Sequence, residues 1–99
     1  MEINKRITEN ETILALCGRL DTTTAPELNK ELTDLFEDGV KDLVLDFEQL
    51  EYISSAGLRE LLFAKKSVGE EGDVVIRNVN DMIMEILEIT GFKDILTIE

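Results

Sequence analysis

Two adjacent serines, Ser54 and Ser55, combine a reactive side-chain type with a position that favours a defined chemistry. The apolar run at 43–47 precedes them and is typical of a strand buried on both faces. Apolar residues at helical spacing follow them over 58–68. The serines are therefore predicted at or just before a helix N-terminus, where free backbone N–H groups and the helix dipole favour negative charge. A serine there can cap the helix or carry a phosphate.

Other polar residues occur at or near the ends of predicted strands. Asp21 and Thr22 follow a strand predicted at 12–17, and Asp46 lies within the strand predicted at 41–47. Open α/β sheets place their sites beyond the carboxyl ends of the strands. We therefore expect these residues to neighbour the serine pair.

The hydrophobic pattern predicts strands that alternate with helices. Thr24 and Glu27 fit a capping box, so a first helix is expected from there to Gly39. The remaining predicted elements are strands at 2–8, 73–79 and 95–98, a helix at about 55–68, and a helix from a cap at Asn80 to Gly91. Such alternation implies crossover units and a largely parallel sheet, to which a hairpin of the first two strands adds an antiparallel edge. We expect one α/β domain over residues 1–99, with a mixed sheet of about five strands and about three helices.

Helical spacing also assigns core positions. In the last helix this spacing predicts that four apolar residues face the core, namely Met82, Ile83, Ile86 and Leu87. The only cysteine, Cys17, ends an apolar run and is expected to be a small buried hydrophobe.

Composition disfavours several functional classes. The 99 residues carry 10 basic and 22 acidic side chains, a net charge of −12, which repels nucleic acid and anionic lipid. This charge suits a basic protein partner, or simply solubility. There is no histidine, no phosphate-binding glycine loop and no Cys/His metal spacing. No stretch is apolar enough to span a membrane or to serve as a signal peptide. We expect a cytoplasmic protein that is not an enzyme and holds no metal or cofactor.

Four segments together resemble a known family. They are Gly18–Leu28, Leu43–Phe47, Tyr52–Leu58 and Leu87–Phe92, and they occur in the expected order, so that the resemblance extends over nearly the whole chain. The sequence is similar to the STAS domain, and more closely to the free-standing bacterial anti-sigma factor antagonists.

This resemblance implies a mechanism of partner switching. The unphosphorylated antagonist binds an anti-sigma factor that is also a serine kinase, and the sigma factor is released. The kinase then phosphorylates the antagonist, and a PPM-type protein phosphatase resets it. The family motif reads Asp-Ser-Ser/Thr-Gly-Leu, with the serine after the aspartate as phosphoacceptor.

Alignment on Gly57-Leu58 places Ser55 at the acceptor position and Ala56 after it. Ser54 stands where the motif has aspartate, which makes it an alternative acceptor or a helix cap. Gly57 is expected to leave room for a partner's backbone. Leu58 is expected either to contact the partner or to belong to the core.

Two alternatives remain open from the sequence. One is a STAS adaptor subunit that docks on a transport or other protein complex without being phosphorylated. The other, a nucleotide-hydrolysing enzyme, would have to work with carboxylates and hydroxyls alone.

Overall fold

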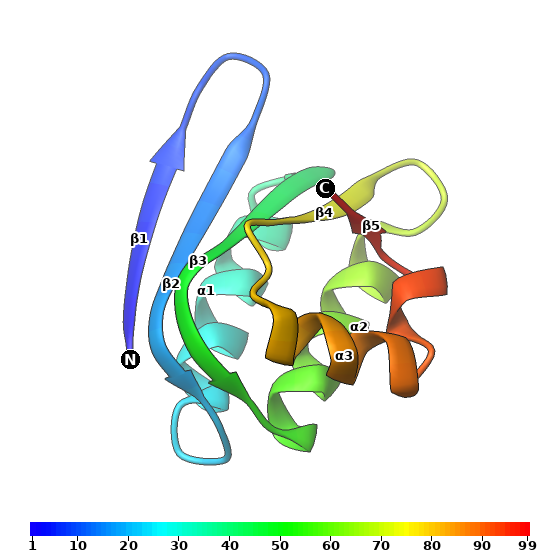
Figure 1. Ribbon diagram of the computed structural model, residues 1–99. Coiled ribbons are helices and arrows are strands. Elements are labelled where there is room, and N and C mark those ends of the chain that lie inside the picture. The colour runs from blue at the N-terminus through cyan, green and yellow to red at the C-terminus, as the bar shows by residue number, and fades with distance from the viewer.

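A five-stranded sheet forms one layer of the structure, a computed structural model that describes residues 1–99 (Figure 1). Strand β1 (Glu2–Ile7) pairs antiparallel with β2 (Thr12–Leu20). Strands β3 (Asp42–Ile53), β4 (Asp73–Arg77) and β5 (Thr97–Ile98) then follow in spatial order, each parallel to its neighbour. The predicted mixed sheet with an N-terminal antiparallel hairpin is confirmed.

Three helices form the second layer and lie on the same side of the sheet (Figure 1). They are α1 (Ala25–Glu37), α2 (Ser55–Val68) and α3 (Asp81–Ile89), and a short 3-10 turn at Phe92–Asp94 follows α3. Their inward side chains and those of one sheet face form a single cluster of 21 buried residues. None of the helices combines the length and the apolar character needed to cross a bilayer.

Residue spacing explains why these segments pack as they do. In β2, Leu14 and Leu16 alternate with less buried residues and face the helices. In α1, Leu28, Leu32 and Leu35 are spaced by four and three residues, so all three lie on the buried face. The same residues therefore specify both the element type and the face that it buries.

Strands β2 and β3 are longer than predicted. The sequence suggested ends at Cys17 and at residue 47, whereas the strands continue to Leu20 and Ile53. In the extension of β3, exposed polar residues at 48, 49 and 51 interrupt the buried Leu50 and Ile53. Because the solvent-facing residues are polar, the sequence pattern does not indicate a strand here, although the other face of the strand is buried in the core. One residue separates the extended β3 from α2, and the extended β2 leaves only a loop of residues 21–24 before α1.

Several smaller expectations were wrong. Thr24 precedes α1, but its side chain caps no helical N–H and instead donates to the Arg19 carbonyl at 2.8 Å. Met82 is half exposed and Cys17 is only half buried. β4 ends at Arg77. The last strand consists of residues 97 and 98 alone, because the backbone N–H groups of Ile95 and Leu96 donate to the Phe92 carbonyl in the preceding turn.

Candidate functional site

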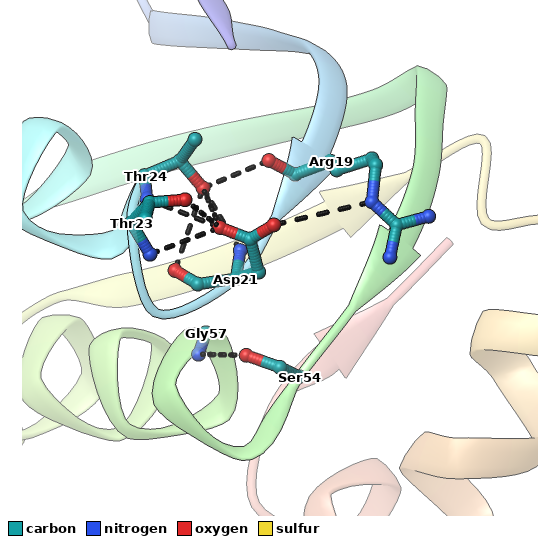
Figure 2. Close-up of polar contacts among 6 residues, drawn as sticks. All are labelled: Arg19, Asp21, Thr23, Thr24, Ser54 and Gly57. Carbon is teal, nitrogen blue, oxygen red and sulfur yellow. Dashed lines mark hydrogen bonds and ion pairs between the residues drawn. The ribbon is translucent and has the colours of Figure 1, made fainter.

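The two serines at the start of α2 have different structural roles. Ser54 is the N-cap, with extended backbone (φ −101°, ψ 177°), and its Oγ accepts a hydrogen bond of 3.4 Å from the Gly57 N–H (Figure 2). Ser55 is the first helical residue and is exposed, and its hydroxyl makes no hydrogen bond. One serine therefore closes the helix, and the other presents a hydroxyl to solvent beside the helix N-terminus.

Backbone contacts attach this helix start to the sheet. The Ser54 N–H donates to the Leu20 carbonyl at the end of β2, at 2.9 Å. A Cβ at Gly57 would lie 2.7 Å from Leu20 Cγ and 2.8 Å from Ile53 Cγ1. The glycine is buried against these side chains, so the expected room for a partner's backbone is wrong. Leu58 is also core, which decides between its two expected roles.

Asp21 organises the neighbouring loop between β2 and α1. Its Oδ1 accepts from the Thr23 hydroxyl at 2.7 Å and from the backbone N–H groups of Thr23 and Thr24 at 3.0 and 3.2 Å (Figure 2). The Thr23 hydroxyl is the main cause of a lowered pKa of the Asp21 carboxyl, although partial burial opposes it. Asp21 is thus an ionised loop-closing group and a poor proton acceptor.

A cation lies beside this loop. The Arg19 guanidinium carbon is 4.2 Å from the centre of the Tyr52 ring, and its Nε is 3.9 Å from Asp21 Oδ2. Stacking on an aromatic face and pairing with a carboxylate both hold the guanidinium at the exposed end of β2. Its exposure limits the energy of this ion pair.

A groove of about 390 Å³ separates the first turns of α1 and α2. Asn29 Nδ2 donates to Glu60 Oε1 across it at 2.8 Å. Arg59 lies one helical turn after Ser55 and makes no ion pair in the structure. The lining residues are Thr22, Ala25, Pro26, Asn29, Ala56, Arg59 and Glu60.

The groove is lined by two residues that were predicted from the sequence and by others that were not. Thr22 and Ala56, which the sequence predicted as site neighbours, both line it. Sequence reasoning missed Asn29, Arg59 and Glu60. For Arg59 a signal was available, because residues four apart on a helix lie on one face and Arg59 is four after Ser55.

Asp46 does not belong to this site. It lies in the middle of β3, eight residues before Ser54, and pairs in register with Ala15 and Arg77. Its Oδ1 accepts from the Asn78 side chain at 2.9 Å and from the Glu48 N–H at 3.0 Å. The expectation that it shapes the charge near the serines fails because β3 continues well beyond it.

Comparisons with known proteins give this geometry a family. The family model described as the STAS domain matches residues 2–99. An anti-sigma-B factor antagonist of Staphylococcus aureus is 35% identical over 80 residues, which cover 80% of this chain and 74% of that protein.

Two solved structures share the fold. A Thermotoga maritima protein described as an anti-sigma factor antagonist matches with a TM-score of 0.91 at 21% identity, over 97% of this chain and 84% of that one. The phosphorylated form of the Bacillus protein SpoIIAA matches with a TM-score of 0.78 at 16% identity, over 99% and 91%. None of these names describes an enzyme. The fold, the family model and the Staphylococcus relative agree, and the chain belongs to the STAS domain family, in the group of the anti-sigma factor antagonists.

Proposed function

We propose that this protein binds an anti-sigma factor while Ser55 is unphosphorylated, and that this binding releases a sigma factor. In the proposed cycle the anti-sigma factor is also a serine kinase that phosphorylates Ser55, and a PPM-type phosphatase removes the phosphate. The observation that carries the proposal is the exposed hydroxyl of Ser55 at the first position of α2. The name of the Staphylococcus relative and the phosphorylated state of SpoIIAA support it.

The local structure favours Ser55 over Ser54 as the acceptor. Ser54 is half buried and its Oγ accepts the capping hydrogen bond, so phosphorylation there would disturb the helix start. Ser55 has no such bond and faces solvent. A kinase could therefore reach the Ser55 hydroxyl without opening the fold.

A phosphate at Ser55 is compatible with the folded domain. It would add about −1.5 to −2 charges. The N-terminal end of α2 would stabilise that charge by about 0.3–1 kcal/mol. Arg59, one turn further along, is an exposed cation with no competing ion pair. The fold is thus expected to survive phosphorylation, and the change should fall on the partner surface.

The groove beside Ser55 is the surface on which we expect the partner to dock. Ala56 lines it, so the modified residue lies at its margin. A phosphate there would repel acidic groups of the partner by its negative charge. It would also place a negative charge near the Arg59 guanidinium. A coupling of about 1–3 kcal/mol would lower the partner's affinity about 5- to 150-fold. We place this cycle in the cytoplasm, with residues 1–99 acting as one domain.

An affinity purification from lysate of the native organism tests the proposal. The baits are wild type, Ser55→Glu and Ser67→Glu. Ser67 is an exposed serine on the same helix, so its variant adds the same charge away from the groove. We expect wild type and Ser67→Glu to retain an ATP-binding anti-sigma factor that Ser55→Glu loses.

Two further outcomes would count against this function. If all three baits retain the same partner, switching at Ser55 is excluded. If that partner belongs to a membrane transport complex, the adaptor function is the correct one. Phosphopeptide mapping of protein from the native cell completes the test, since stoichiometric phosphate only on another residue would also refute the assignment.

A further inference from the structure

Helix α3 carries two apolar stripes, although only one of them faces the core. Ile83 and Leu87 are buried in the core cluster. Met82 is 50% exposed and Ile89 is 77% exposed, and they lie seven residues apart on one side of the helix. Ile86 falls between them and is only partly buried. A surface helix of a monomeric domain normally presents polar residues on its outer side.

These three residues, Met82, Ile86 and Ile89, form what we call the outer stripe. Spacings of four and three residues place them on one face, and the stripe extends about 10 Å along the helix axis. Anchors at i, i+4 and i+7 are the usual pattern by which one amphipathic helix recognises another. Ile95, just after the 3-10 turn, is also exposed and adds apolar surface in the adjoining segment.

The charges on this helix select the kind of partner. Every charged residue of α3 is acidic, namely Asp81, Glu85 and Glu88. The nearest bases in sequence, Arg77 and Lys93, each lie four residues beyond an end of the helix. Lys93 forms an exposed pair of 3.5 Å with Glu88, and Arg77 is paired with Glu11 and Glu99. Two copies of such a face would repel one another, and each chain carries a net charge of −12. Charge complementarity therefore favours a basic occupant over a second copy of this chain.

We propose that the outer stripe of α3 is a docking surface for a basic amphipathic helix of another protein. The partner's apolar residues would cover Met82, Ile86 and Ile89, and its lysines or arginines would face the acidic residues beside them. Methionine suits such a surface because its flexible, polarisable side chain adapts to the partner.

This surface is separate from the proposed phosphorylation site at Ser55. No residue of α3 lines the groove between α1 and α2. A partner on α3 could thus bind while the groove is occupied or empty. The inference does not depend on the proposed function, and phosphorylation of Ser55 is not expected to abolish binding at α3.

Nuclear magnetic resonance titration of the isotope-labelled protein tests the inference. The probe is a model amphipathic helix built of leucine and lysine, and its twin carries glutamate in place of lysine. We expect the lysine peptide to shift the amide resonances of residues 82–89, and the glutamate peptide to leave them unchanged. Raising the salt concentration should weaken the binding of the lysine peptide.

Two serine variants provide matched controls. Ile89→Ser removes the most exposed member of the stripe, whereas Ile7→Ser removes an isoleucine that is 66% exposed on β1. Both side chains lie outside the core, so both variants should fold. Loss of the contact that Ile89 would make should lower the affinity for the lysine peptide by about tenfold. Ile7→Ser should bind the peptide with the same affinity as wild type.

Three results would overturn the proposal. The first is that the lysine peptide shifts resonances outside α3 and leaves residues 82–89 unchanged. The second is equal affinity of Ile89→Ser and wild type for the peptide. The third is concentration-dependent dimerisation in sedimentation that Ile89→Ser abolishes, which would assign the stripe to a second copy of the chain.

Discussion

Replacing Gly57 with alanine tests why a glycine stands at this position. It distinguishes close packing of α2 against the sheet from a need for space for a partner's backbone. The added Cβ would lie 2.7 Å from Leu20 Cγ and 2.8 Å from Ile53 Cγ1. Both atoms are bonded directly to Cβ of their side chains, so the overlap is not relieved by moving only the end of a side chain. Both neighbours are essentially inaccessible to solvent. Overpacking a core in this way costs about 1–3 kcal/mol. Alanine regains at most about 1 kcal/mol of helix propensity.

The expected net effect is a loss of about 1–2 kcal/mol in the free energy of unfolding. For a domain of this size each kcal/mol lowers the melting temperature by about 4–8 °C. Urea unfolding measures the loss directly, and an unchanged m-value would show that the compactness of the two states is preserved. If Gly57 instead served a partner, alanine would leave stability unchanged or raised and would weaken binding alone.

A double-mutant cycle with Leu20→Ala locates the cause. Removing the Leu20 side chain beyond Cβ eliminates the overlap with Leu20 and leaves the one with Ile53, so Gly57→Ala should cost less in that background than in wild type but should still cost something. The packing argument is refuted if Gly57→Ala is as stable as wild type. It is refuted equally if the cost of Gly57→Ala is the same with and without Leu20.

Three further predictions concern the site and the packing of the sheet. Ser54→Ala should lower the free energy of unfolding by about 0.5–1 kcal/mol through loss of the cap, whereas Ser55→Ala should change it by less than about 0.5 kcal/mol in thermal unfolding. Because the Asp21 pKa is lowered in the folded protein, its carboxylate stabilises the fold above the ordinary value of 3.8, and this contribution is lost as the pH falls below it. In pH-dependent unfolding, Asp21→Asn should therefore be less stable than wild type at neutral pH, with a difference that shrinks in acid. Gly72→Ala should reduce stability more than any of these, as measured by urea unfolding, because its Cβ would lie 2.0 Å from the Lys41 carbonyl oxygen, a backbone atom that cannot rotate away.

The order of strands and helices could be predicted because apolar spacing changes clearly from one element to the next. Leu28 and Leu32 indicate a helix, and the run at 43–47 indicates a buried strand. The ends of β2 and β3 could not be predicted in the same way. Leu50 and Ile53 are separated by polar residues that face solvent, and such a pattern resembles a loop until the other face is known to be covered.

The candidate site was only partly predictable for a related reason. Local sequence placed both serines at a helix start, but it could not decide which one caps the helix, because that depends on the backbone angles of Ser54. Asn29 and Arg59 were missed since the groove exists only where α1 packs against α2. Asp46 was misplaced because its distance from the serines depends on the true length of β3.

The departure from the family motif at Ser54 has a physical consequence for the proposed switch. An aspartate at the cap would place a fixed negative charge next to the acceptor and would already compensate the helix dipole. Ser54 caps α2 with a neutral oxygen instead, so that the dipole remains available to a phosphate on Ser55. Asp21 in the neighbouring loop stays ionised, and the hydrogen bonds that it accepts from Thr23 and Thr24 compensate its charge only in part. The proposed phosphorylated state is therefore less opposed by this domain's own charges than it would be with aspartate at 54, and most of the switching energy must arise in the interface with the partner.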